Sequence, residues 1–427
     1  MQSRSIAGAR VESPSRQRHV LALILLVVLF FSFIDRVNVS ILVVDPEFLA
    51  DMGIAGSALQ KGMLMTVFLA AYGIGNVFLS PLGDRVGPRK AMSIAIAIWS
   101  VSLLVGGITS TFTAMLASRV ILGLSEGVHF PMQSKYVKEW YPLSERGKAN
   151  SIWQAGISVA PALAMPLFTF IIHTSGWRSS FFILCAAGLI PLTLIWFFTS
   201  DTPRQNKRVN ELELTHIETG LRKEHEALKN HQTTVQQIKS FAGNYQFWLL
   251  TLYYALHNAI FWGMMTWLPT YLKEARGFSW SAMGLLSSLP WIVSLFAKFV
   301  GGYLLDRANR RAPFIFWAMV AVTLGVYLGA SLENATISAI LLAIGIGATG
   351  FALPAIWTLL QDLVPSHSIG AGAGMMNGLA TGLSALAPLM IGFVVKTTGS
   401  YADGLYALVG CSIFAGLIML CMTLKGK

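Results

Sequence analysis

Ser80-Pro81-Leu82-Gly83-Asp84-Arg85-Val86-Gly87-Pro88-Arg89-Lys90 lies between two long apolar stretches, and a similar segment occurs in the second half of the chain. This second segment reads Gly302-Tyr303-Leu304-Leu305-Asp306-Arg307-Ala308-Asn309-Arg310-Arg311, and its Asp306 follows Asp84 by 222 residues. In both segments an Asp-Arg pair and further basic residues end an apolar stretch. A repeat at this spacing in a chain of 427 residues indicates two related halves.

The composition excludes an ordinary soluble protein. Hydrophobic residues make up 54% of the chain and charged residues 12%, and the mean hydropathy is +0.61. A helix needs roughly 20 apolar residues to cross a bilayer. Twelve segments reach about this length, at 20–44, 60–82, 91–110, 112–134, 149–172, 180–199, 246–270, 281–304, 313–331, 336–360, 369–394 and 405–424.

A polar stretch in the middle of the chain separates six of these segments from the other six. We therefore predict an all-α integral membrane protein, with twelve transmembrane helices in two pseudo-symmetric bundles of six. The expected organisation is an N-terminal tail (1–19), a first bundle (20–199), a central loop (200–245), a second bundle (246–424) and a short C-terminal tail (425–427).

The net charge of +11 is better explained by membrane topology than by binding to nucleic acid. The basic residues gather in alternate connections, and the positive-inside rule then places both termini and the central loop in the cytoplasm. Short loops and compact length favour a cell inner membrane, and a monomer is the default expectation. The three cysteines lie inside apolar segments at no metal-ligand spacing, so we interpret them as packing residues and expect no metal.

The repeated loop segments contain candidate gating residues. An Asp-Arg pair at a helix end can interact with a neighbouring helix dipole and with basic groups across the half, and so hold one face of the protein closed in one state. A solvated turn that only obeys the positive-inside rule is the alternative. The gating candidates are Asp84, Arg85, Arg89, Asp306 and Arg307.

Two adjacent charges interrupt the first apolar segment, in Phe33-Ile34-Asp35-Arg36-Val37-Asn38-Val39-Ser40. A charge at this depth costs a few kcal/mol or more, so it normally faces a protein interior or a water-filled path. Counted from the outer ends of their helices, Asp35 and Arg119 lie at similar depth, which predicts an ion pair between them. Successive residues on a helix point about 100° apart, so Arg36 has a different role and stays available to an anion.

Glu126 follows Arg119 by seven residues and falls near the bilayer centre. A lone carboxyl group there is more stable protonated than ionised, so it can exchange a proton as hydration changes. A permanently protonated or salt-bridged structural carboxyl is the alternative. His129, one turn further on, is either a hydrogen-bonded packing residue or part of the proton pathway.

Other polar or aromatic residues also occur within the apolar segments. Each is either an ordinary interhelical contact or a substrate contact, and the residues alone leave this open. The candidates are Tyr72, Gln154, His257, Asn258, Trp357 and Asn377.

The repeated loop resembles the cytoplasmic signature of the major facilitator superfamily. Further motifs are similar to those of its anion:cation symporter family, which includes proton-coupled carriers of galactonate and hexuronates. They are Asp35-Arg36-Val37-Asn38, Arg119 with Glu126 and Pro131, the segment from Glu139 to Ala149, Trp267-Leu268-Pro269-Thr270-Tyr271-Leu272 and Gly374-Met375-Met376-Asn377-Gly378.

This resemblance implies roles for individual residues. It implies that Arg36 binds a substrate carboxylate, that Asp35 and Glu126 couple transport to protons, and that Arg119 interacts electrostatically with Asp35. The sequence departs from the galactonate-type carriers at His129. The positions that match the family's substrate cavity are Tyr72, Gln154, Trp357 and Asn377.

We therefore predict a proton-coupled carrier that takes up a small organic anion by alternating access. The substrate is a sugar acid, another carboxylate or a sulfonate; no cofactor is expected, and Na⁺ in place of H⁺ is not excluded. The alternative is a proton antiporter that exports an organic compound or drug, but Arg36 and Arg119 would repel cationic drugs. An enzyme is disfavoured, because the sequence has no nucleophile with a base and no metal-binding motif.

Overall fold

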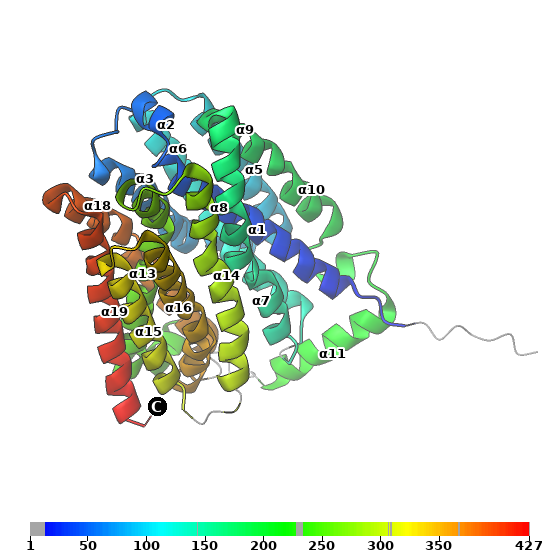
Figure 1. Cartoon of the computed structure of the whole chain (residues 1–427). Coiled ribbons are helices and arrows are strands. Elements are labelled where there is room, and N and C mark those ends of the chain that lie inside the picture. The colour runs from blue at the N-terminus through cyan, green and yellow to red at the C-terminus, as the bar shows by residue number, and fades with distance from the viewer. Residues whose placement is uncertain are drawn as a thin grey trace, which may run out of the picture.

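The computed structural model describes residues 13–426 except 143, 228–233, 306, 308–309 and 366–367. Within these residues the regular structure is helical (Figure 1). The spans of the first half are α1 (Gln17–Leu42), α3 (Ala58–Ile74) with the π-helical turn η1 (Gly75–Leu79), α5 (Pro88–Ile108), α6 (Phe112–Trp140), α7 (Arg146–Gln154) with α8 (Gly156–Ser175), and α9 (Trp177–Ala187) with α10 (Leu189–Phe198).

The second half has the same number of spans. They are α13 (Tyr245–Thr270) with the π-helical turn η3 (Tyr271–Ala275), α14 (Trp280–Leu305), α15 (Ala312–Ser331), α16 (Ala335–Leu363), α17 (Ile369–Ser384) with α18 (Ala387–Thr398), and α19 (Tyr401–Leu424). Shorter helices connect the spans or lie beside them: α2 (Pro46–Asp51), α4 (Ser80–Val86), η2 (Pro203–Gln205), α11 (Glu211–Ala227) and α12 (Thr234–Ala242).

Ten of the described spans are long and apolar enough to cross a membrane by composition alone. The two others, α6 and α13, are 29 and 26 residues long, but charged, amide and histidine side chains lower their hydropathy. Both lie among the other spans in Figure 1. With them the bundle has the twelve spans and the all-α membrane fold that the sequence predicts.

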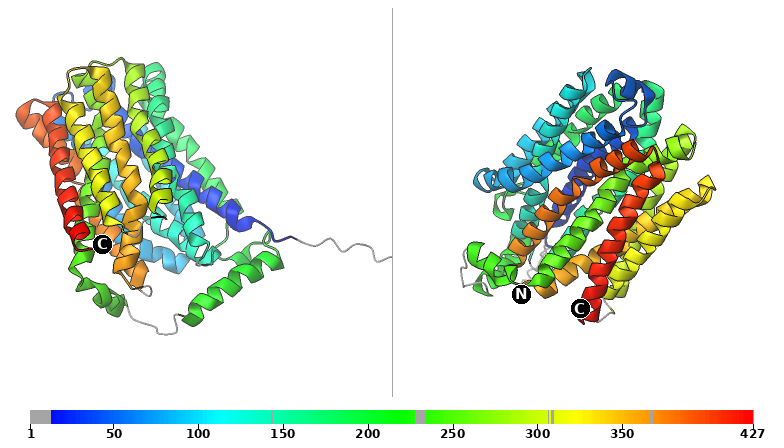
Figure 2. Two further views of the ribbon diagram at one scale, coloured as in Figure 1. Left: turned by 60° about the horizontal axis from the view of Figure 1, so that its bottom comes forward. Right: turned by 90° about the vertical axis from the view of Figure 1, so that its left-hand side faces the viewer.

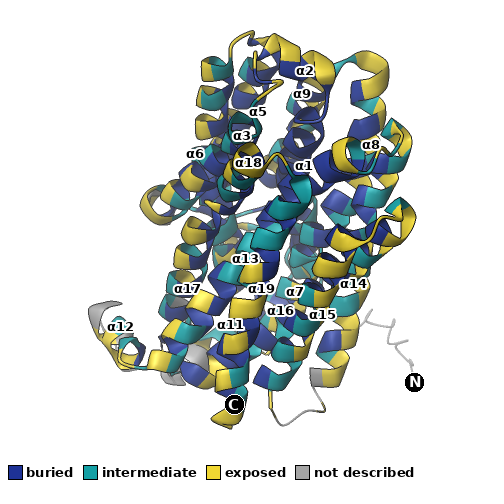
Figure 3. Ribbon diagram, turned by 60° about the vertical axis from the view of Figure 1, so that its left-hand side comes forward, coloured by how far each residue is buried: buried dark blue, intermediate teal, exposed yellow. Residues whose placement is uncertain are grey.

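The first helix, α1, begins and the last helix, α19, ends at the same end of the molecule, as an even number of spans requires (Figure 2). We call the end with Gln17 and Leu424 the terminal face, and the end with Leu42 and Thr270 the distal face. Large apolar side chains, among them Phe299 on α14, are exposed on the outside of the bundle. Figure 3 shows such exposed positions alternating with buried ones along the spans.

The two halves pack closely at the distal face. A Cβ atom on Gly62 of α3 would lie 2.5 Å from the carbonyl oxygen of Pro388, and one on Gly392 of α18 would lie 2.5 Å from that of Ala58. Only glycine allows this approach of the two backbones. The indole Nε1 of Trp280 on α14 also donates a hydrogen bond of 2.7 Å to the carbonyl oxygen of Thr169 on α8. The structure is therefore closed at the distal face.

Candidate functional site

A cavity lies between the two halves, from the middle of the bundle toward the terminal face, and encloses about 810 Å³ of empty space including the part open to solvent. All seven residues that sequence reasoning proposed as substrate contacts line it. These are Arg36, Tyr72, Gln154, His257, Asn258, Trp357 and Asn377.

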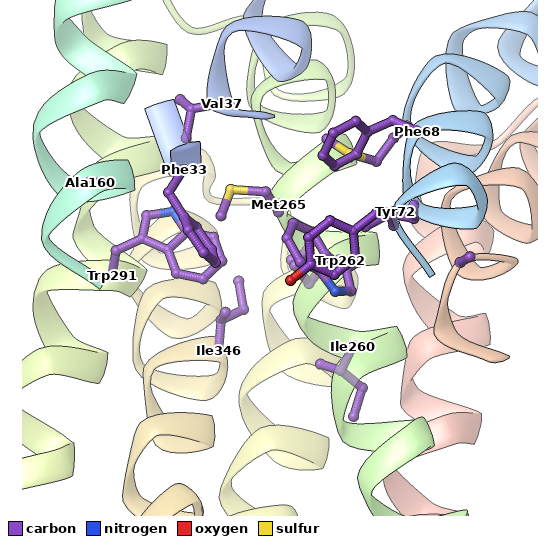
Figure 4. Close-up of a cluster of buried hydrophobic side chains, with 14 of the residues drawn as sticks. Phe33, Val37, Phe68, Tyr72, Ala160, Ile260, Trp262, Met265, Trp291 and Ile346 are labelled. Atoms are coloured by element: carbon purple, nitrogen blue, oxygen red, sulfur yellow. The ribbon is translucent and has the colours of Figure 1, made fainter. Parts of the chain in front are cut away.

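Arg36 lies at the distal end of the cavity, inside a cluster of aromatic rings. Its guanidinium carbon is 4.4 Å from the ring centre of Phe33, 4.8 Å from Tyr72, 5.3 Å from Phe68 and 5.5 Å from Trp262. Phe33 of α1 stacks on Trp262 of α13, with ring centres 6.0 Å apart. Figure 4 shows the side chains of Phe33, Phe68, Tyr72 and Trp262 together. Contacts of this kind stabilise a cation by about 0.5–2 kcal/mol each and hold the guanidinium in place.

Arg36 forms a buried ion pair with Glu126 of α6. Its Nη2 and Nε donate to Oε2 of Glu126 at 2.8 and 3.0 Å, and the Ser32 hydroxyl donates to the same oxygen at 2.8 Å. The other oxygen, Oε1, has no hydrogen-bond partner among the described residues. The expectation that Arg36 is free for an anion is therefore corrected: in this state a carboxylate of the protein occupies it.

Asp35 and Arg119 do not form the ion pair that the depth count predicts. Both side chains are buried, yet no contact within 4.0 Å joins them in the part of the chain that the structure describes. Arg119 instead faces the ring of Phe181, with 5.4 Å from its guanidinium carbon to the ring centre. Asp35 Oδ2 and Arg119 Nε have no hydrogen-bond partner among these residues.

The direction of helical side chains explains both corrections. Side chains tilt toward the N-terminus of their helix, which is the terminal face for α1 and the distal face for α6. Asp35 and Arg119 therefore tilt away from each other although their backbones lie at similar depth. Arg36 and Glu126, whose backbones differ in depth, tilt toward each other and meet.

His129 is buried in the first half and does not line the cavity. Its ring packs edge-on against Trp99 of α5, with ring centres 5.9 Å apart. Its Nε2 has no hydrogen-bond partner among the described residues. One turn before it on α6, Glu126 contacts Arg36, so His129 lies behind the ion pair as seen from the cavity.

The second half provides an aromatic and polar wall to the cavity. His257 of α13 stacks on Tyr254, with ring centres 6.1 Å apart, and Tyr254 packs edge-on against Trp357 of α16 at 5.7 Å. Asn258 and Asn377 supply amide groups beside these rings. The rings of this wall can pack against the carbon atoms of a small polar organic molecule, and its amide groups can form hydrogen bonds with hydroxyl groups.

Several lining residues were missed by sequence reasoning. The most important is Lys298 of α14, whose Nζ donates a hydrogen bond to the Ser158 hydroxyl of α8. It is the only charged residue between positions 281 and 304, and the argument applied to Asp35 and Arg36 would have found it. Phe33 and Trp262 carried no such signal, because an aromatic residue in a span is usually a packing residue.

The candidate gating residues have different surroundings. The backbone N–H of Arg89 donates to Asp201 Oδ1 at 2.8 Å, and its side chain donates to the carbonyl oxygen of Trp196, so neither contact reaches the second half. Arg85 is exposed, and Arg307 is exposed above the ring of Tyr303. The side chain of Asp84 and all of Asp306 lie outside what the structure describes. The latch at the terminal face therefore stays a prediction.

An ion pair joins the two halves at the distal face. Lys61 Nζ of α3 lies 2.9 Å from Glu274 Oε1 of η3, and the Tyr401 hydroxyl of α19 donates to the other carboxylate oxygen. The Lys61 side chain is 4% exposed and that of Glu274 30% exposed. This partly buried pair stabilises the state that is closed at the distal face.

We expect Glu274→Gln to shift the protein toward the state that is open at the distal face. The substitution leaves Lys61 largely buried without its counter-charge, which costs more than the loss of an exposed pair. Spin–spin distances between labels on the distal ends of α3 and α18 should become longer in a larger fraction of molecules. Lys396→Met, which removes an exposed charge near the same face, is the control. An unchanged distance distribution in Glu274→Gln would contradict this gating role.

Comparison with protein families gives one model, described as Major Facilitator Superfamily, that matches residues 25–388. A probable sulfoacetate transporter of Cupriavidus necator is 29% identical over 90% of this chain and 89% of its own. A probable galactarate/D-glucarate transporter of Escherichia coli K12 is 28% identical over 95% and 93%, and a hexuronate transporter of Bacillus subtilis is 25% identical over 91% and 90%.

Solved structures show the same fold. A bacterial homologue of the human lysosomal transporter spinster superposes with a TM-score of 0.76 and 18% identity, and covers 96% of this chain and 97% of its own. A D-xylose-proton symporter superposes with a TM-score of 0.73 and 17% identity, over 94% and 96% of the two chains. At these identities the likeness concerns the fold alone.

Proposed function

The chain belongs to the Major Facilitator Superfamily and is a membrane transporter, not an enzyme, and from this premise we propose that it takes up a small organic anion together with protons. The relatives support the substrate class, because sulfoacetate, galactarate, D-glucarate and hexuronates are all organic anions. Their curated names also agree with the anion:cation symporter branch of the superfamily.

The main support for the proposal is the ion pair between Arg36 and Glu126 at the cavity. A substrate carboxylate needs the same two donors, Nε and Nη2, that Glu126 now engages. Paired N–H donors in a planar fork are suited to a carboxylate, and such bonds are stronger than neutral ones. Substrate and Glu126 therefore compete for one cation.

Protonation of Glu126 determines which carboxylate binds Arg36. When Glu126 is protonated it loses its charge and its hold on Arg36 weakens, so Arg36 becomes available to the substrate. Oε1, which has no hydrogen-bond partner among the described residues, is the oxygen that accepts the proton at least cost to the existing bonds. Binding of substrate and of a proton then favour each other, which is the thermodynamic requirement for symport. Asp35, buried nearby on α1, is a second candidate for a proton.

The proposed direction of transport depends on how the protein is oriented in the membrane and on the direction of the proton gradient. The basic residues gather in alternate connections, which supports a cytoplasmic terminal face by the positive-inside rule. In this orientation the distal face, which is closed in the structure, would be extracellular, and the cavity would lie toward the cytoplasmic side. A proton gradient directed inward would drive the anion into the cell.

Uptake into proteoliposomes tests this proposal. Labelled sugar acids, aromatic acids, dicarboxylates and sulfonates are offered with and without an imposed proton gradient, with Na⁺ replaced by choline in parallel. We expect saturable uptake of at least one class, accelerated by external acid and abolished by a protonophore. Absence of saturable anion uptake from all four classes would contradict the proposal, and dependence on Na⁺ would contradict proton coupling.

A further inference from the structure

The cavity contains a second cation that has no acidic partner among the described residues. Lys298 is the only charged residue of α14, and its Nζ donates to the neutral hydroxyl of Ser158. No carboxylate oxygen of the described chain lies within 4.0 Å of it. A cation inside a span normally pairs with an anion or faces an aqueous path. Because Lys298 lines the cavity, an anion that neutralises it can arrive with the substrate.

Lys298 and Arg36 lie on different halves and at different depths. Arg36 lies six residues before the distal end of α1, whereas Lys298 lies seven residues before the terminal end of α14. At a rise of 1.5 Å per residue, the backbone of Lys298 lies about 27 Å from the distal end of α14, and that of Arg36 lies about 9 Å from the distal end of α1. Because aromatic rings and Glu126 hold Arg36 in place, a substrate that engages both cations needs a separate acidic group for each.

We propose that the substrate is a dianion whose two acidic groups lie at opposite ends of a short chain, one bound by Arg36 and the other by Lys298. This inference rests on the proposed function and narrows its substrate class. Once Glu126 is protonated, both cations of the cavity are available, and a dianion neutralises both where a monoanion leaves Lys298 unpaired. The second acidic group would replace the Ser158 hydroxyl as the partner of Nζ.

The remaining lining fits a polar chain between the two acidic groups. Hydroxyl and amide groups from both halves face this part of the cavity, and each can donate to or accept from hydroxyl groups of the substrate. They belong to Gln154, Asn258, Ser294, Thr349, Asn377 and Thr381. A dianion bound in this way joins α1 of the first half to α14 of the second, so its binding is coupled to the relative position of the two halves.

Pairs of anions that differ in their second acidic group test the inference. D-glucarate with D-gluconate, galactarate with D-galactonate, and sulfoacetate with acetate each compete against a labelled substrate in proteoliposomes of the full-length protein. In the pair that contains the best substrate, we expect the dianion to compete at least tenfold better than the monoanion. Equal or better competition by the monoanion would overturn the inference.

Variants of the lysine separate its charge from its size. We expect Lys298→Gln to lower kcat/KM for the dianion at least tenfold and for its monoanion less than threefold, and Lys298→Arg to retain most of the preference. Ser158→Ala is the control, because it removes the neutral partner and leaves the cation. An equal loss for both anions in Lys298→Gln would show a structural role and overturn the inference.

The two proposals fail in different ways. If a monoanion such as D-gluconate is taken up with protons and no dianion is preferred, only the dianion inference fails. If no organic anion of either charge is taken up, the proposed function fails as well. If the Lys298 variants do not fold, thermal stabilisation of the purified wild-type protein tests the inference instead. A dianion should raise the Tm of this protein more than the matched monoanion at equal concentration. An equal or smaller rise would overturn the inference.

Discussion

Arg36→Ala is expected to abolish anion uptake, with kcat/KM in proteoliposomes falling by at least about a hundredfold. The variant removes the two donors that a substrate carboxylate would share, and hydrogen bonds from a charged group contribute about 1.5–3 kcal/mol each. It also leaves the aromatic cluster of Phe33, Tyr72 and Trp262 without its cation. Initial rates of labelled uptake, normalised to reconstituted protein, measure the effect.

Two further variants distinguish loss of binding from loss of structure. Arg36→Lys keeps the charge but not the planar fork, so we expect an intermediate rate. Arg36→Ala alone leaves the carboxylate of Glu126 buried without its counter-charge, which destabilises the protein. The double variant Arg36→Ala/Glu126→Gln removes this unpaired charge and should restore stability. Its uptake should stay absent. Uptake above a tenth of the wild-type rate in a folded Arg36→Ala protein would mean that another group binds the anion.

Glu126→Gln is expected to separate exchange from accumulation. Glutamine has the size and neutrality of the protonated glutamate, so it leaves Arg36 available to the substrate but cannot release a proton. Counterflow of labelled against unlabelled anion should persist, and accumulation driven by a proton gradient should be lost. Both are measured in the same proteoliposomes, with and without an imposed gradient.

A neutralised glutamate elsewhere on the same helix provides the control. Glu139 lies near the terminal end of α6, outside the cavity, so Glu139→Gln should behave as wild type in both assays. Normal proton-driven accumulation by Glu126→Gln would remove Glu126 from the coupling scheme and leave Asp35 as the remaining acidic candidate on α1.

The spans could be predicted closely because the bilayer fixes their length and composition. The apolar segment 246–270, for example, corresponds to α13 (Tyr245–Thr270), and segment 281–304 to α14 (Trp280–Leu305). The repeated loop after the second and eighth spans indicated the two halves. Bends inside spans were less visible: the first half of segment 149–172 is interrupted between α7 and α8, and a π-helical turn follows α3 at Gly75.

The pairing of the charged residues could not be predicted from depth alone. A residue count from a helix end places the backbone, whereas Arg36 and Glu126 meet because long side chains on antiparallel helices tilt toward each other. Lys298 was overlooked for a related reason. A charge within an apolar segment marks a residue of interest, but its residue number does not show what its side chain faces. The packing of α8 against α14 shows that Lys298 lines the cavity.

The pair formed by Arg36 and Glu126 has a consequence for the voltage dependence of transport. A membrane potential acts on each charge that moves through it, with about 2.3 kcal/mol per elementary charge per 100 mV. In the empty carrier the ionised carboxylate cancels the charge of the guanidinium 2.8 Å away. This site therefore contributes no net charge when the empty protein returns to its starting state. Under the proposed function, the voltage should then act mainly on the other charges of the cycle, and a carrier whose cation is already neutralised should reset without an anion bound.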